Sequence, residues 1–126
     1  KPNKQEFADF AGLNFDGVED YTAAAREVAA RYKTMVVLSL GADGALAAAG
    51  SQVLNARPPQ VTITSAVGSG DCLLAAIMHA AISGADMREQ LRCGVAAGTA
   101  NALTLGAGVF SRKDYERIYA DVKVHS

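Results

Sequence analysis

The segment "TMVVLSL", residues 34–40, constrains the fold of this chain more strongly than any other stretch. It is a continuous run of β-branched and apolar residues, which is typical of a strand covered on both faces. Strands of this kind belong to sheets that carry helices on either side. We therefore expect an α/β domain with this segment as one of its strands.

Two helices are expected before this strand. Asn3 can cap a short helix that ends at Gly12, because asparagine accepts a free N–H at a helix start and glycine favours the end. A second helix is expected from an Asp20 cap through residues 21–33, where apolar residues repeat at helical spacing.

The chain after the buried strand has the pattern of short strands. "GADG" turns the chain, and residues 45–50 and 51–56 are expected to form antiparallel strands. "PQVTIT", residues 59–64, alternates well enough to be a further strand. Pro58 and Pro59 limit the start of that strand to a sheet edge, because proline has no N–H to donate.

Three helices are expected in the second half of the chain. They are Asp71–Ser83, Asp86–Leu105 and a last helix that follows Ser111. The apolar residues expected on overlapping faces of the first are Leu74, Ile77, Met78, Ala81 and Ile82. Four glycines in the later part suit helices and backbones that pack closely together, namely Gly94, Gly98, Gly106 and Gly108. No repeat or linker interrupts the chain, so residues 1–126 are expected to form a single domain.

Charge and hydropathy exclude several classes of partner. The chain has 12 basic and 13 acidic residues and a net charge of -1, which provides no basic surface for nucleic acid or an anionic membrane. No apolar stretch reaches the roughly 20 residues of a membrane span, and no targeting segment opens the chain. We expect a cytoplasmic location. Cys72 and Cys93 lack metal-site spacing and are expected to be buried thiols.

The segment "TSAVGSGDCLLAA", residues 64–76, places a glycine-rich turn at the start of a helix. Unpaired N–H groups at a helix start form a site for an anion, and Gly68 and Gly70 permit a close approach. Ser69 adds a hydroxyl. Asp71 has two interpretations: it caps the helix, or it accepts the proton of an alcohol that attacks a phosphoryl group.

Two other segments carry weaker signals. Asn3 and Glu6 form either a capping box or a pair of ligands for a hydrated Mg²⁺. Ser39, Gly41 and Gly44 belong either to an ordinary hairpin or to a turn that lies against a nucleotide. A P-loop and a dinucleotide fingerprint are both excluded, because no Gly-Lys pair occurs and no third glycine follows at the required spacing.

Taken in order, "KPNKQE", "SLGADGAL", "AVGSGD" and "AAGTANALTLGAG" resemble the pfkB family of ribokinase-like sugar kinases. The resemblance implies the C-terminal portion of a three-layer α/β/α sandwich, with a mostly parallel sheet and a short antiparallel edge. It implies that Asp71 is the catalytic base and that Gly68, Ser69 and Gly70 form the anion hole. It further implies magnesium at Asn3 and Glu6, and a nucleotide beside Lys1, Ser39, Gly41, Gly44 and Asn101.

The function implied by the resemblance is ATP-dependent phosphoryl transfer to a hydroxyl of a phosphorylated ketohexose, of the fructose 1-phosphate or tagatose 6-phosphate type. The cofactors would be ATP and Mg²⁺. The family's chains are longer, so this chain would be the nucleotide-binding half and largely inactive alone. Its open sheet edge could pair two copies as a homodimer. The alternatives are a nucleotide-binding module without catalysis and a kinase of another sugar, a nucleoside or a vitamin.

Overall fold

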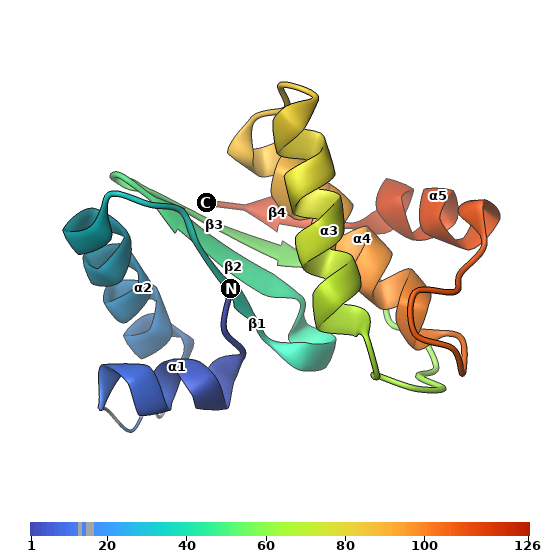
Figure 1. The fold of residues 1–126 in the computed structure, drawn as a ribbon, viewed down its shortest axis with the longest axis horizontal. Coiled ribbons are helices and arrows are strands. Elements are labelled where there is room, and N and C mark those ends of the chain that lie inside the picture. Colours follow the sequence, from blue (N-terminus) through green and yellow to red (C-terminus); the bar gives the residue numbers. More distant parts are fainter. Residues whose placement is uncertain (13, 15–16) are drawn as a thin grey trace.

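The fold is that of a computed structural model, which describes residues 1–12, 14 and 17–126. Along the chain the elements are α1 (Lys4–Ala11), α2 (Val18–Tyr32), β1 (Val36–Ser39), a 3₁₀ turn (Gly41–Asp43), β2 (Ala45–Ala49), β3 (Gln52–Arg57), α3 (Ser69–Ile82), α4 (Met87–Ala102), α5 (Arg112–Asp121) and β4 (Lys123–His125). Figure 1 shows the sheet in the middle, with α1 and α2 on one side and the later helices on the other. None of the described helices is long and apolar enough to cross a membrane.

The four strands found in the described residues form one sheet in the order β1-β2-β3-β4, with antiparallel neighbours throughout. The expected strand at residues 34–40 and the two antiparallel strands after it are thereby confirmed. A parallel contact occurs at the outer side of β1, where Asn3 and Ser39 form an isolated bridge and the Ser39 N–H donates to the Pro2 carbonyl at 3.2 Å. The mostly parallel sheet that the resemblance implies is therefore not found in the described residues, where this bridge is the only parallel contact. Short turns join β1 to β2 and β2 to β3, and short turns can connect only antiparallel neighbours.

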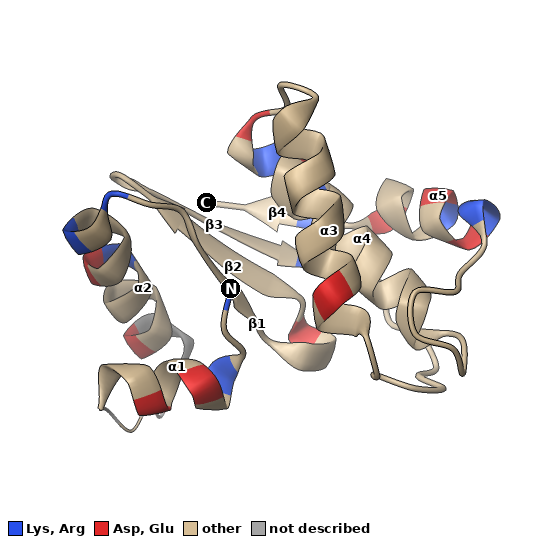
Figure 2. Ribbon diagram, viewed as in Figure 1, with Lys and Arg blue, Asp and Glu red and all other residues tan. Residues whose placement is uncertain are grey.

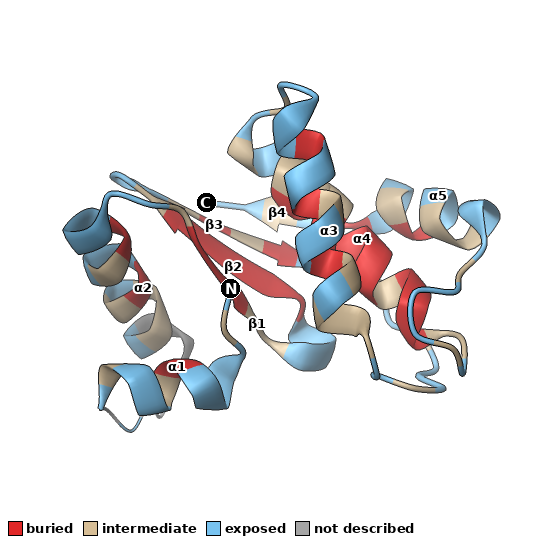
Figure 3. Cartoon of the chain, in the orientation of Figure 1, coloured by how far each residue is buried: buried red, intermediate tan, exposed pale blue. Residues whose placement is uncertain are grey.

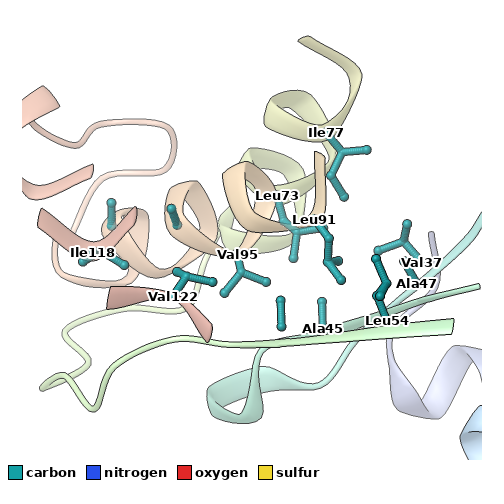
Figure 4. Close-up of a cluster of buried hydrophobic side chains, with 13 residues drawn as sticks. Val37, Ala45, Ala47, Leu54, Leu73, Ile77, Leu91, Val95, Ile118 and Val122 are labelled. Carbon is teal, nitrogen blue, oxygen red and sulfur yellow. The ribbon is translucent and has the colours of Figure 1, made fainter. Parts of the chain in front are cut away.

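The two faces of the sheet bury different residues, because neighbouring positions of a strand point to opposite sides. One face carries Val36 and Leu38 of β1, which contact α1 and α2 together with the fully buried Phe7. The other carries Val37 and its neighbours under α3, α4 and α5. Figure 4 shows side chains of α4 lying between that helix and the strands. Helices therefore cover both faces, as the continuous apolar run predicts.

The start of α2 differs from its prediction. The helix begins at Val18 with Gly17 as its N-cap, so Asp20 lies inside the first turn and is not the cap. Glycine is well tolerated at this position, and Gly17 is extended (φ −150°, ψ 167°). The helix therefore takes in two residues before the predicted cap.

The strand predicted at "PQVTIT" is wrong, because residues 58–64 form no strand. β3 is already paired on both sides, by β2 and by β4, so the chain that follows leaves the sheet. The N–H groups of Thr64 and Ser65 donate instead to the Ala102 carbonyl, at 2.8 and 3.1 Å. This segment therefore crosses from the sheet to the end of α4.

The helix predicted from Asp71 begins earlier, at Ser69, and of the predicted face it buries only Ile77. Its buried residues are Leu73, Ile77 and Ala80. The predicted face is mostly in solvent, with Leu74 38%, Met78 55% and Ile82 86% exposed. Figure 3 shows exposed residues along much of α3. α4 also ends at Ala102, three residues before the predicted Leu105.

Two glycines of α4 decide which face of α3 is buried. A Cβ built at Gly94 would lie 2.7 Å from Ile77 Cγ1, and one at Gly98 would lie 3.0 Å from the Ser69 carbonyl oxygen. Both distances are shorter than ordinary contacts, so the helices approach too closely for a larger residue. The close packing predicted from Gly94 and Gly98 is confirmed.

Replacing Gly94 by alanine is expected to destabilise the fold. Overpacking costs about 1–3 kcal/mol, whereas alanine gains about 1 kcal/mol in helix propensity. The net loss should appear as a lower Tm in thermal unfolding. A double-mutant cycle with Ile77→Ala should show a combined loss smaller than the sum, because the shorter side chain makes room. A higher Tm for Gly94→Ala would contradict the close approach.

Candidate functional site

A cavity of about 970 Å³ lies where four parts of the chain meet. Its walls come from residues 1–5, the turn after β1, residues 58–66 and the facing parts of α3 and α4. Figure 1 shows the start of α3 beside the turn that follows β1. The cavity is therefore built from segments far apart in the sequence.

The structure brings most of the predicted site residues to this cavity. Those on its wall are Lys1, Asn3, Ser39, Gly41, Gly44, Ser69 and Gly70. Those that do not line it are Glu6, Gly68, Asp71 and Asn101. The glycine-rich turn and the turn after β1 thus face a common space, as expected for two loops that bind one ligand.

The glycine-rich turn has the backbone geometry that the sequence predicts. Gly68 is the N-cap of α3 at φ 80°, a left-handed conformation that favours glycine, and a Cβ there would lie 2.7 Å from Ala107 Cβ. Gly70 lies beside the Lys1 ammonium, since its missing Cβ would be 3.1 Å from Lys1 Nζ. A positive charge therefore adjoins the start of the helix.

One of the three main-chain N–H groups predicted to bind an anion in this turn is already hydrogen-bonded. The Ser69 N–H already donates to the Ala66 carbonyl at 3.1 Å, so it is not available to an anion. The N–H groups of Gly68, Gly70 and Asp71 make no hydrogen bond with any residue that the structure describes. These three amides lie at the positive end of the helix dipole. The turn can therefore bind negative oxygen, with Asp71 replacing Ser69 as a main-chain donor.

Asp71 presents an open carboxylate in the first turn of α3. Its side chain is exposed, and no hydrogen bond or ion pair joins it to the part of the chain that is described. The N-cap of α3 is Gly68 and carries no side-chain cap, so the interpretation of Asp71 as a cap is wrong. Figure 2 shows acidic colouring on α3 near its start, and the acidic residue of the first turn is Asp71. The carboxylate is free to accept a proton.

Asn3 and Glu6 form the capping box that was one of their two interpretations. Asn3 Oδ1 accepts the Glu6 N–H at 2.9 Å, and Glu6 Oε2 accepts the Asn3 N–H at 2.8 Å. Each side chain is exposed, and no described residue donates a hydrogen bond to Glu6 Oε1. The described residues include no cluster of three or more His, Cys, Asp or Glu suited to a metal. A magnesium role for the pair stays a proposal.

The turn after β1 contains Gly44, whose backbone conformation and close contact with β3 would be strained in any other residue. Gly44 has φ 93° and ψ −126°, and a Cβ there would lie 2.0 Å from the Ala56 carbonyl oxygen. Its own carbonyl accepts the Leu40 N–H at 2.8 Å. Tight packing against β3 therefore fixes the loop that contributes Gly41 and Asp43 to the cavity wall.

Asn101 is not placed to touch a nucleotide. It is fully buried, and its Nδ2 donates to the Val67 carbonyl at 2.8 Å and to Ser69 Oγ at 3.0 Å. Its Oδ1 accepts the Gly108 N–H at 2.7 Å. Both polar groups of the side chain are therefore engaged inside the protein, and Asn101 does not line the cavity, so its side chain has no direct contact with the space where a nucleotide is expected.

Sequence reasoning missed the apolar wall of the cavity. Val61 and Ile63 line it from the segment misassigned as a strand, and Val95, Thr99 and Ala102 line it from α4. The Pro58-Pro59 pair was a usable signal, because two residues without N–H groups favour a chain that leaves a sheet. A mainly apolar wall with a small number of polar groups is typical of sites for small molecules and cofactors.

A polar cluster between α4 and α5 lies outside the cavity. Cys93 Sγ is 3.4 Å from Glu89 Oε1, which also accepts the Tyr119 hydroxyl. Burial raises the pKa of the Cys93 thiol, and Glu89 raises it further, against a lowering by Tyr115. Cys93 and Cys72 are both free thiols, and each is only partly buried where burial was expected. A thiol held protonated is a poor nucleophile.

We expect Cys93 to be alkylated slowly at neutral pH. A raised pKa means that less thiolate is present at any given pH, so the rate should reach half its maximum above the ordinary value of 9.0. The measurement is the pH profile of iodoacetamide labelling in a Cys72→Ser background, followed by mass spectrometry. Glu89→Gln should move the profile to lower pH, because it removes a negative charge. Rapid labelling at neutral pH would contradict the assignment.

The family model of the pfkB family carbohydrate kinases matches residues 1–114. The chain belongs to the pfkB family. Among curated relatives, it is 38% identical over 107 residues to the 1-phosphofructokinase of Rhodobacter capsulatus, covering 85% of this chain. It is 35% identical over 121 residues to the ATP-dependent 6-phosphofructokinase isozyme 2 of Escherichia coli, covering 95% of this chain. The chain spans 32% and 39% of the lengths of these two relatives.

Solved structures agree with this membership of the pfkB family. The Escherichia coli phosphofructokinase-2 in complex with potassium matches with a TM-score of 0.88 and 34% identity, over 94% of this chain and 39% of that one. The Arabidopsis thaliana ribokinase complexed with ribose and ATP matches with a TM-score of 0.79 and 25% identity, over 94% of this chain and 39% of that one. The ribokinase-like α/β fold class predicted from the sequence is confirmed.

Proposed function

We propose that residues 1–126 form the nucleotide-binding part of an ATP-dependent kinase that phosphorylates a hydroxyl of a ketohexose phosphate. The observation that carries the proposal is the start of α3, where free main-chain amides and an open carboxylate adjoin one another. Phosphoryl transfer requires both features, since donors stabilise the charge on the moving group and a base accepts the alcohol proton. The pfkB membership and the two phosphofructokinase relatives support the substrate class.

Each part of the cavity has a role in this proposal. The apolar wall at Val61 and Ile63 suits the base of ATP, and the turn after β1 suits the ribose and phosphates. The Lys1 ammonium beside Gly70 suits a phosphate charge. The amides of Gly70 and Asp71 would then meet the transferring phosphoryl group.

Mg²⁺ fits the pair at the start of α1 as a weak, hydrated ligand set. Glu6 retains one carboxylate oxygen outside the capping box, and Asn3 lies on the cavity wall. Mg²⁺ usually keeps several waters and takes one or two carboxylates besides the phosphates of a nucleotide. When bound, the ion would neutralise phosphate charge, while this chain's residues hold the nucleotide in place.

The test joins residues 1–126 to the remainder of the Rhodobacter capsulatus 1-phosphofructokinase, in place of the segment that they match. We expect Mg²⁺-dependent ADP release that requires fructose 1-phosphate, fructose 6-phosphate or tagatose 6-phosphate. ATP binding without release under any of these acceptors, in a folded fusion, would support a nucleotide-binding module instead. Self-association along the open side of β1 is a further proposal, and sedimentation of the 126-residue chain tests it.

A further inference from the structure

We propose that Asn101 is a positioning residue that sets the conformation of the glycine-rich turn by tying it to the loop after α4. The proposal rests on the proposed function and names what holds the turn in place. Two segments are involved: the entry loop, residues 64–70, and the exit loop, residues 103–110. Both make hydrogen bonds with Asn101, which lies in the last turn of α4.

The hydrogen bonds of Asn101 bracket the N-cap of α3. Its Nδ2 donates to the carbonyl of Val67, directly before Gly68, and to the hydroxyl oxygen of Ser69, directly after it. One amide group thus holds both neighbours of the residue whose φ of 80° turns the chain into the helix. Because Asn101 is fully buried, water cannot replace these bonds while the loops stay closed.

The same side chain also holds the exit loop. Asn101 Oδ1 accepts the Gly108 N–H at 2.7 Å. The residue before Gly108 is Ala107, and its Cβ lies 2.7 Å from the place that a Cβ of residue 68 would take. The two loops therefore contact each other directly and share one buried amide. A second tie joins the entry loop to the same turn of α4, because Thr64 and Ser65 both donate to the Ala102 carbonyl.

Asn101 is placed to hold the glycine-rich turn but not to contact a nucleotide in the cavity. Thr99 and Ala102 line the cavity from α4, whereas Asn101 is buried and does not. Losing its amide should therefore displace the free amides of Gly70 and Asp71 while leaving the cavity wall intact. This predicts an effect on kcat that is larger than the effect on the KM for ATP.

The experiment uses three variants. Asn101→Leu keeps the approximate volume and removes every hydrogen bond. Asn101→Asp keeps an acceptor for the Gly108 N–H and loses the two donors to the entry loop. Ser69→Ala removes one of those donor bonds at a half-buried position, so it should fold even if the buried variants do not. Ile118→Val, on the buried face of α5, is the control for a general loss of stability.

The first measurement is amide hydrogen exchange of the 126-residue chain, which does not depend on activity. Asn101→Leu should speed exchange about tenfold in both loops, and Asn101→Asp should do so in the entry loop more than in the exit loop. Ser69→Ala should give a smaller rise confined to residues 66–72. Unchanged exchange in the folded variants, or a rise equal to that of Ile118→Val in every segment, would overturn the proposal.

The second measurement is the kinetics of the fused kinase. Asn101→Leu should lower kcat about 10- to 100-fold, with the KM for ATP within about threefold of the parent. Ile118→Val should change neither constant beyond that margin. If the parent fusion shows no turnover, the proposed function fails, yet the exchange result still decides whether Asn101 ties the loops. A folded Asn101→Leu with parental kcat would overturn its positioning role.

Discussion

Replacing Asp71 by asparagine is expected to reduce the kcat of the fused kinase by about 10²–10⁴-fold, the usual contribution of a general base. The open carboxylate in the first turn of α3 can accept the proton of an attacking hydroxyl, and an amide of the same shape cannot. The backbone amides of the turn are unchanged by the substitution. The KM for ATP should therefore stay close to that of the parent, because the loss falls on the chemical step.

Asp86→Asn is the matched control for this substitution. Asp86 also stands at the start of a helix, where it accepts the Glu89 N–H at 2.8 Å as the N-cap of α4, and asparagine caps equally well. We expect parental turnover from this variant. Both substitutions remove a charge that interacts with a helix dipole, worth about 0.3–1 kcal/mol, so their Tm values should fall by similar amounts. Turnover of Asp71→Asn within a few-fold of the parent would refute the role of the base.

Replacing Gly44 by alanine is expected to cause the largest loss of stability among single substitutions in the cavity wall. The added Cβ would lie 2.0 Å from the Ala56 carbonyl oxygen, and backbone cannot move aside as a flexible side chain can. The residue would also have to hold φ 93°, which a side chain strongly disfavours. Strain and overpacking together cost about 2–6 kcal/mol. Urea denaturation measures this loss.

Gly41→Ala separates the two causes. Gly41 lies in the same turn at φ 62°, but none of the described residues comes within 4 Å of its missing Cβ. Its substitution should cost only the conformational strain, about 1–2 kcal/mol. The difference between the two variants then measures the close approach of the turn to β3. Equal losses would show that the contact between Gly44 and Ala56 is unimportant.

Sequence reasoning succeeded where structure is determined by neighbours along the chain. Asn3 and Glu6 lie three residues apart, and the capping box they form needs nothing beyond the first turn of α1. β2 and β3 are joined by a tight turn, so their pairing is also local. The family resemblance added the order of the site segments, which the cavity brings together.

Sequence reasoning failed where contacts between segments far apart in the sequence determine the structure. α3 is apolar on both sides, so helical spacing alone gives two equally good faces, and the glycines of α4 select the one with Leu73 and Ile77. The partners of Asn101 lie 34 and 32 residues before it, at Val67 and Ser69, and no local pattern indicates them. A buried amide in an alanine-rich helix was a usable signal, because a buried polar side chain must find partners.

The order of strands in the sheet has a consequence for synthesis on the ribosome. β4 pairs with β3 through Asn55 and His125, so the strand that closes this side of the sheet emerges after every other described element. At usual translation rates the residues between β3 and β4 take on the order of several seconds to be made. During that time the outer side of β3 has unpaired backbone groups, so nascent chains stalled before residue 123 would be those most in need of a chaperone.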